Sequence, residues 1–418
     1  MKFDTIIIGG GLSGLVCGIK LQKAGRKCAV ISAGQSALHF SSGTFDILDR
    51  DQNGSTVSSP LTAMKALGES HPYSKIGGDK AASYAAGIKE FFSGCGIELG
   101  GDVSRNRYRV TPTGEFAPAC LSLKDFVLWD SCCSVPASRV LIINIFGYLD
   151  FNTKFIAESF ENKGADCRVI SVKLEEMERL RQNPSEMRAT NIARVLDKEE
   201  VYRRFISEVS KELKGEDMIV LPAVFGLRSA DVVDRIRESF NVKVQFVATM
   251  PPSVPGIRTQ MRLREEFERD GGTYLLGDTV NVAEMTQDRV MSIGTVNFGN
   301  IRLTADNYVL ASGSFFSKGL IAVPDKIYEP VFGLDVYYEK SRSDWYSPKL
   351  FDRQNYISFG VKTDDRFHPS KNGVKFSNLY AIGSVLEGYN ALSEGSGAGV
   401  AIISAMYVAD LISEKESK

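Results

Sequence analysis

The chain has 418 residues, which is enough for two or three domains with a sizeable core. Its 50 basic and 51 acidic side chains nearly cancel, so no global charge would recruit nucleic acid or an anionic membrane. We find no apolar run approaching the roughly 20 residues of a membrane span and no signal peptide pattern. These features predict a cytoplasmic protein with no nucleic-acid partner and no direct membrane span.

The first segment with a chemical signature lies at the N-terminus. The apolar run Thr5–Ile8 ends in the glycines Gly9, Gly11 and Gly14, a helical pattern follows, and Cys28–Ile31 forms a second apolar run. This strand–helix–strand pattern with G-x-G-x-x-G is typical of nucleotide binding, because glycine lets phosphate oxygens approach the backbone at a helix N-terminus. We therefore predict a nucleotide or flavin phosphate site at these glycines.

The end of the second strand departs from this pattern. An acidic residue usually stands there and holds the ribose hydroxyls of adenosine. Here the position is Ser32, which cannot supply a carboxylate. Two interpretations follow: a full dinucleotide held by other groups, or a shorter ligand such as a mononucleotide flavin.

A small, polar loop at residues 35–46 follows this strand, on the edge of the sheet that faces the ligand in open α/β folds. It contains His39, Ser41, Ser42 and Gly43, which we assign to the candidate site. We weigh three roles for His39: a proton donor beside a flavin ring, a point of covalent flavin attachment, or a hydrogen-bonding residue that orders the loop. Further on, we expect one amphipathic helix over residues 81–97.

The middle of the chain predicts a second domain. A hairpin-like segment around residues 107–116 precedes the apolar strand Val140–Gly147, a helix over 152–163 and another strand at 167–172. This second strand–helix–strand unit lacks the glycine triplet, so it is interpreted as structural. The predicted fold is α/β: a discontinuous Rossmann-like flavin-binding domain at 1–110 and 262–418, with an inserted second α/β domain at 111–261, a substrate-like or interface domain.

Two further segments in this region carry possible chemistry. A loop with three prolines and a glycine leads into Arg258, which suits the binding of an anionic substrate or, alternatively, a domain-crossing turn with a surface arginine. The adjacent Cys132 and Cys133 are either redox-active or incidental. The spacing of the seven cysteines and three histidines indicates no metal site.

The C-terminal part returns to buried strands that end in small residues. One strand runs over 308–314 and includes Gly313, and another at 379–385 includes Gly383 and Ser384. Gly397 and Gly399 then open an apolar helix, where close approach to a helix N-terminus would stabilise negative charge on a reduced ring.

Together these motifs resemble the two-domain flavoprotein superfamily. The N-terminal glycines resemble its phosphate site, and Val309–Gly313 and Ile382–Ser384 resemble two of its later flavin-contact strands. In that superfamily an aspartate usually stands at the position of Ser384 and binds the ribityl chain. Ser32 and Ser384 therefore depart from the pattern at two ligand-contact positions.

The whole chain also resembles the B subunit of anaerobic glycerol-3-phosphate dehydrogenase. The matching peptides run from end to end and are Thr5–Gly14, Gln35–Gly43, Ala189–Arg194, Pro251–Val254, Gly256–Arg258, Ala311–Phe316, Gly333–Val336 and Ala381–Leu386. The resemblance implies a complex with two partners: a catalytic subunit that bears FAD, and an iron–sulfur subunit that attaches the complex to the inner face of the membrane. The complex oxidises glycerol 3-phosphate to dihydroxyacetone phosphate and passes electrons to quinone. For this chain the resemblance implies FMN, with FAD as the alternative.

Three functions are compatible with these observations. The leading hypothesis is a flavin electron relay, since the catalytic partner would carry out the dehydrogenation. The second is a non-catalytic scaffold that has lost its ligand and bridges the catalytic and iron–sulfur partners. The third is a stand-alone flavin oxidoreductase acting on an organic acid. The intact glycines favour a bound flavin over the scaffold.

Overall fold

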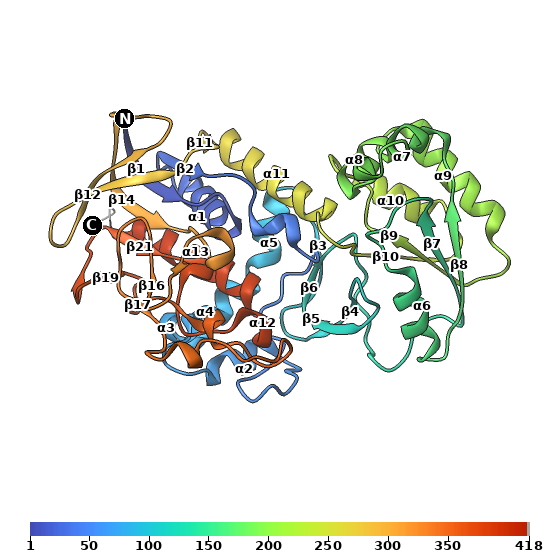
Figure 1. Cartoon of the computed structure of the whole chain (residues 1–418), viewed down its shortest axis with the longest axis horizontal. Coiled ribbons are helices and arrows are strands. Elements are labelled where there is room, and N and C mark those ends of the chain that lie inside the picture. The colour runs from blue at the N-terminus through green and yellow to red at the C-terminus, as the bar shows by residue number, and fades with distance from the viewer. Residues whose placement is uncertain (416–418) are drawn as a thin grey trace. The chain divides into compact units, whose positions relative to one another are not determined.

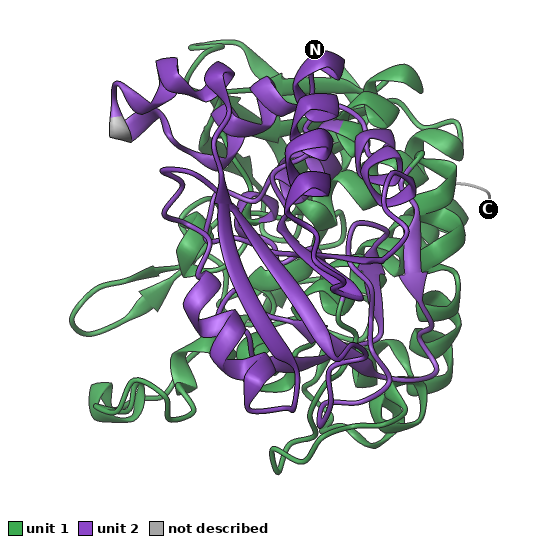
Figure 2. Cartoon of the chain, turned by 90° about the vertical axis from the view of Figure 1, so that its right-hand side faces the viewer, with its two compact units in different colours: residues 1–37, 46–96, 262–418 green, residues 38–45, 97–261 purple. Residues whose placement is uncertain are grey.

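The computed structural model describes residues 1–415 and divides into two compact units. The first unit comprises residues 1–37, 46–96 and the chain from 262 onward, and the second comprises residues 38–45 and 97–261. Figure 2 shows the two units in different colours. Each unit has its own sheet and core.

The sheet of the first unit has the order β11-β2-β1-β14-β13-β12, and β21 pairs with β14 (Figure 1). The pairs among β11, β2, β1, β14 and β21 are parallel, whereas β12, β13 and β14 pair antiparallel. Parallel strands buried on both faces favour the continuous apolar runs that the sequence shows. The strands are β1 (Lys2–Ile8), β2 (Cys28–Ser32), β11 (Thr273–Leu276), β12 (Val280–Met285), β13 (Val290–Thr295), β14 (Arg302–Leu310) and β21 (Leu379–Ala381).

Two apolar helices dominate the packing of this unit: α1 and α13 lie against each other, and α13 also contacts α3 and α4. Among residues 1–415, α13 is the one helix long and apolar enough to cross a membrane, but 67% of its most apolar stretch is buried. Such burial is typical of a core helix. The helices are α1 (Leu12–Lys23), α2 (Pro60–Ala63), α3 (Pro72–Ile76), α4 (Gly78–Ala86), α5 (Ile88–Gly94), α12 (Ala391–Glu394) and α13 (Gly397–Lys415).

The single helix expected over residues 81–97 is two helices. α4 ends and α5 begins at Gly87, whose backbone caps both helices. Glycine lowers the stability of a helix interior, so a break at this position has a local cause.

The second unit contains a parallel four-stranded sheet in the order β10-β9-β7-β8. Its strands are β7 (Arg139–Ile145), β8 (Asp166–Val172), β9 (Met218–Pro222) and β10 (Lys243–Val247), and its helices are α6 (Thr153–Glu161), α7 (Glu178–Arg181), α8 (Ala189–Leu196), α9 (Glu199–Glu212) and α10 (Asp231–Glu238). Two ribbons complete it: β3 (Leu99–Gly101) with β6 (Leu121–Leu123), and β4 (Arg107–Val110) with β5 (Phe116–Ala119). The predicted strand–helix–strand segment corresponds to β7-α6-β8.

The unit boundaries differ in two places from the predicted domains. Residues 97–110 belong to the second unit, because β3 pairs with β6 and β4 pairs with β5. Residues 38–45 also belong to it, since Thr44 bridges to Ser122 and the Phe45 amide donates to the Leu121 carbonyl. The boundary at 261/262 lies within helix α11 (Val254–Arg269).

Candidate functional site

The three N-terminal glycines form a tight turn between β1 and α1. Gly9 has a φ of 123°, and a Cβ atom there would collide with the carbonyl of Ala311. At Gly14 a Cβ atom would collide with the Gly9 carbonyl, so α1 packs directly on the turn. At Gly11 the nearest atom to an added Cβ would be Ser36 Cβ, 3.7 Å away. The first and third glycines are therefore needed for packing, whereas the second leaves room for a side-chain atom.

The N-terminus of α1 is suited to an anion. Gly11 is its N-cap, no described side chain caps it, and its first turn has no acidic residue. The first amides of a helix have no intrahelical acceptors and lie at the positive end of the helix dipole. The room beside Gly11 and the polarity of these amides together suit the binding of a phosphate group.

Ser32 ends β2 and is almost fully buried, with its hydroxyl donating to the Gly34 carbonyl over 3.0 Å. On the neighbouring strand, the hydroxyl of Tyr274 lies 3.4 Å from the Gly10 carbonyl. A Cβ atom at Gly10 would collide with that hydroxyl and would lie 2.6 Å from Ser32 Oγ. Where the usual ribose-binding acid would lie, the structure therefore has the hydroxyl groups of Ser32 and Tyr274, both packed against Gly10.

The strands β14 and β21 end beside each other in small residues. Ser384 is exposed, and its Oγ lies 3.7 Å from the Cβ position of Gly313. Ser312 precedes Gly313, and its Oγ is buried without a hydrogen-bond partner among the described residues. Carboxyl ends of parallel strands are where ligands bind in open α/β sheets. The structure therefore places the predicted residues Gly313 and Ser384 beside each other, with Ser312 next to them.

Gly383 and Gly399 make their close contacts with the protein itself. The Gly383 amide donates to Ser404 Oγ of α13 over 3.0 Å, and a Cβ atom there would lie 2.5 Å from Ser13 Oγ. A Cβ atom at Gly399 would collide with the hydroxyl of Tyr73. Gly397 has more room, since its nearest neighbour would be Ala391 Cβ at 3.3 Å. Of the two glycines assigned to the start of α13, Gly397 is therefore the less crowded, although a contact of 3.3 Å is still tight.

A buried polar cluster holds the turn before α13. Glu394 is 4% exposed, and its carboxylate accepts from the Asn390 amide (3.1 Å) and from Ser396 Oγ (3.2 Å). His71 Nε2 lies 3.4 Å from the same carboxylate, and Nδ1 accepts from the Tyr73 amide. This cluster fixes the path of the chain into Gly397.

The remaining predicted residues belong to the second unit. In the 38–45 segment, the Gly43 amide donates to Ser41 Oγ over 3.0 Å, and the hydroxyls of Ser42 and Thr44 lie 3.1 Å apart. Gly43 has a φ of 83°, and a Cβ atom there would collide with the ring of Phe126. The bonds of these residues order their own loop.

His39 is half-buried in this segment. Its backbone carbonyl accepts from the Ser253 amide over 2.7 Å, and its side chain hydrogen-bonds to Gln260. Burial lowers the pKa of the imidazole, and the bond to Gln260 partly offsets this effect. These contacts support the loop-ordering role among the three roles considered for His39.

A His39→Gln variant tests this role through the pH dependence of stability. Because the pKa of His39 is lower in the folded chain than its ordinary value of about 6.5, acidification protonates the unfolded chain more readily. The contribution of His39 to stability is therefore lost as pH falls below about 6.5. We expect the free energy of unfolding, measured by chemical denaturation at about pH 7.5 and 5.5, to fall less between these two pH values in the variant than in the parent protein. Equal losses would contradict the assignment.

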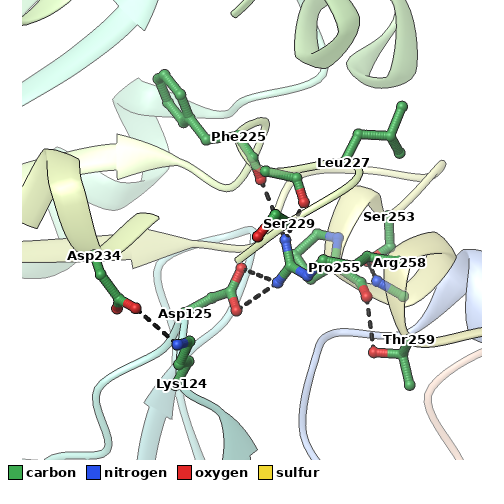
Figure 3. A network of polar contacts seen from close by, with 12 residues as sticks. Lys124, Asp125, Phe225, Leu227, Ser229, Asp234, Ser253, Pro255, Arg258 and Thr259 are labelled. Carbon is green, nitrogen blue, oxygen red and sulfur yellow. Dashed lines mark hydrogen bonds and ion pairs between the residues drawn. The ribbon is translucent and has the colours of Figure 1, made fainter. Parts of the chain in front are cut away.

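Arg258 is buried, with 6% of its surface exposed, and both terminal nitrogens of its guanidinium donate hydrogen bonds (Figure 3). Nη2 donates to both carboxylate oxygens of Asp125 at 2.5 and 2.6 Å, and Nη1 donates to the Gly226 carbonyl at 2.5 Å. Asp125 is 2% exposed. A substrate anion would have to displace this carboxylate, which argues against the predicted substrate-binding role and favours a structural one.

Most of the predicted cofactor residues thus lie in the first unit, at the carboxyl ends of its parallel strands and at two helix N-termini. His39, Arg258 and the Ser41–Gly43 segment lie in the second unit. Within residues 1–415, no group of three or more histidine, cysteine or acidic side chains is arranged to hold a metal.

The family model for the FAD binding domain matches residues 4–400 of the chain. The B subunit of anaerobic glycerol-3-phosphate dehydrogenase from Yersinia pseudotuberculosis is 43% identical over 419 residues, covering 99% of this chain and 98% of the relative. The proteins of the same name from Pectobacterium carotovorum and Haemophilus influenzae are 40% and 35% identical, and each match covers 99% of this chain and 99% and 100% of the relative. The predicted Rossmann-like flavoprotein fold is confirmed. The chain belongs to the FAD binding domain family and, within it, to the family of the B subunit of anaerobic glycerol-3-phosphate dehydrogenase.

Proposed function

We propose that this chain binds a flavin in its first unit and serves as an electron relay in an anaerobic glycerol-3-phosphate dehydrogenase. The observation that carries the proposal is the N-terminus of α1 at Gly11, which no described side chain caps and where an added Cβ atom would meet only Ser36 Cβ, at 3.7 Å. The buried hydroxyl of Ser312, without a partner among the described residues, supplies a second group for a ligand. Both groups could bind a ligand that carries a phosphate and hydroxyl groups.

The donor set fits a phosphate-bearing flavin. The amides at the start of α1 would hold its phosphate, and the hydroxyls of Ser312 and Ser384 would bind its polyhydroxyl chain. The N-terminus of α13 at Gly397 would stabilise negative charge on the reduced ring. A bound flavin supplies the reversible uptake of electrons that protein side chains lack.

Two observations bear on the length of this ligand and favour different answers. Ser32 supplies no carboxylate at the usual position for an adenosine ribose, its hydroxyl is engaged by Gly34, and Tyr274 packs against Gly10, which favours the shorter ligand. The match to an FAD binding domain favours the full dinucleotide. We propose FMN, with FAD as the alternative, and the mass of the released flavin distinguishes them.

The name of the relatives supports a complex with other chains, since it denotes one lettered subunit of an enzyme. We infer that a catalytic subunit, which bears FAD, oxidises glycerol 3-phosphate and that an iron–sulfur subunit passes electrons towards quinone. The iron–sulfur partner would also place this chain at the inner face of the cell membrane. The second unit of this chain, a substrate-like or interface domain, would then serve as an interface. Its buried Arg258–Asp125 pair supports this, because the pair leaves no free guanidinium for substrate at that position.

The relay is tested with the isolated chain and with the chain co-expressed with its catalytic and iron–sulfur partners. Dithionite should bleach the flavin of the isolated chain, whereas glycerol 3-phosphate should bleach it only when the catalytic partner is present. Full dehydrogenase turnover by the isolated chain with an artificial acceptor would overturn the relay. A folded chain that resists flavin reconstitution would favour the scaffold.

A further inference from the structure

Two adjacent cysteines in the second unit stand apart from the other thiols of the chain. The Sγ atoms of Cys132 and Cys133 lie 3.7 Å apart in the segment between β6 and β7. Cys133 is exposed and Cys132 is half-buried, whereas the remaining cysteines are buried except for the half-buried Cys167. The pair combines solvent access with a neighbouring thiol, which no other cysteine in the described chain has.

The surroundings of the pair are ordered and favour a thiolate at one position. Tyr108 is held by a pair of backbone hydrogen bonds to Trp129, of 2.8 and 2.7 Å, and its hydroxyl hydrogen-bonds to Cys132. This bond lowers the pKa of Cys132, and the bond from Cys133 and the charge of Lys163 act in the same direction. By contrast, burial raises the pKa of Cys167 to about 12. Cys132 is therefore the better nucleophile of the two half-buried thiols.

We propose that Cys132 and Cys133 form a dithiol modification site that is oxidised by low-molecular-weight disulfides such as oxidised glutathione. Cys132 is the attacking thiol, and Cys133, 3.7 Å away, is the resolving thiol. The site is separate from the flavin-binding residues of the first unit, and its reaction does not need the flavin.

The two steps balance in atoms and electrons. The Cys132 thiolate attacks one sulfur of the external disulfide, its S–S bond breaks, and the released thiolate takes up the proton that Cys132 has lost. The Cys133 thiolate then attacks Cys132 Sγ in the mixed disulfide, and the second small thiol leaves with the proton of Cys133. The two cysteines lose two electrons in total, and the external disulfide is reduced to two thiols.

Covalent geometry makes this product easy to reverse. Adjacent Cα atoms are about 3.8 Å apart, below the usual separation of about 4.4–6.8 Å in disulfides, so a bridge between neighbours is strained and readily reduced. Ser131 and Ser134, which flank the pair, line a cavity of about 540 Å³ whose wall includes Val127 and Trp129.

The test uses the full chain, reduced and then incubated anaerobically with oxidised glutathione. Intact mass should fall by two hydrogen atoms, and peptide mapping should place the bridge at the pair. Cys133→Ser should stop at a mixed disulfide and gain one glutathionyl group. Cys132→Ser should react at least about tenfold more slowly, because the activated thiolate is gone. The control Cys167→Ser should behave like the parent protein.

Other outcomes overturn the proposal. A parent protein that remains reduced contradicts the reactivity of the site. A parent protein that keeps one glutathionyl group without forming the Cys132–Cys133 bridge contradicts the resolving role of Cys133. Oxidation that maps to Cys167 contradicts the selectivity of the site. Since Cys132 and Cys133 are at the surface, circular dichroism of both serine variants should match the parent, and thiol addition should restore the original mass.

Discussion

A Gly11→Asp variant is expected to keep its fold and lose its flavin. A Cβ atom at Gly11 would meet only Ser36 Cβ, at 3.7 Å, so the protein itself has room for a side chain. The new carboxylate would stand beside the phosphate at the N-terminus of α1. Two like charges about 4 Å apart at an effective dielectric constant of 20 repel by about 4 kcal/mol, or about a thousandfold in affinity.

The measurement is flavin titration of the apoprotein, with thermal unfolding as the check on the fold. The matched control is Gly87→Asp in the same unit, since Gly87 has a negative φ of −82° and an added Cβ atom there would lie 3.6 Å from its nearest neighbour. The control should bind flavin like the parent protein. Unchanged flavin affinity in Gly11→Asp would place the phosphate elsewhere.

An Asp125→Ala variant is expected to destabilise the second unit by about 3–5 kcal/mol, because it leaves the Arg258 guanidinium buried without its carboxylate. Both side chains are less than a tenth exposed, and the bonds between them are 2.5 and 2.6 Å long. Urea denaturation measures the loss. If Arg258 instead binds substrate at an accessible site, Asp125→Ala should cost less than about 1 kcal/mol.

The double variant Asp125→Leu with Arg258→Met further tests whether the buried ion pair is the cause of the lost stability. Replacing a buried ion pair by apolar side chains of similar volume is often neutral, so at least half of the lost stability should return. The carbonyls of Phe225 and Gly226 lose a donor, which limits the recovery. A double variant as unstable as Asp125→Ala would show that the charge pair is not the cause.

The sequence was sufficient to predict the α/β fold and the N-terminal phosphate turn. Buried parallel strands leave continuous apolar runs, and the glycines at 9, 11 and 14 fall between two of them, so both features are local in sequence. The register of β1 between β2 and β14 then follows from parallel pairing over the whole of the strand's apolar run.

Residue roles that depend on long-range contacts were not predictable. Asp125 and Arg258 are 133 positions apart, and nothing near Arg258 indicates a buried carboxylate partner. A glycine in the sequence can indicate a close approach of another residue, but it does not show which residue that is. The neighbour is Tyr73 at Gly399 and Phe126 at Gly43. Ser312 lies at the end of a strand that the sequence predicts, but only the folded structure shows that its hydroxyl is buried without a hydrogen-bond partner among the described residues.

The most direct test of the flavin site is the native mass and absorbance spectrum of the purified chain. We predict a yellow protein whose mass exceeds that of the polypeptide by one flavin, released by heat or acid. A released FMN would agree with the absence of a carboxylate at Ser32, and FAD would mean that other groups hold the adenosine ribose. A folded chain with no bound flavin, before and after reconstitution, would contradict the account.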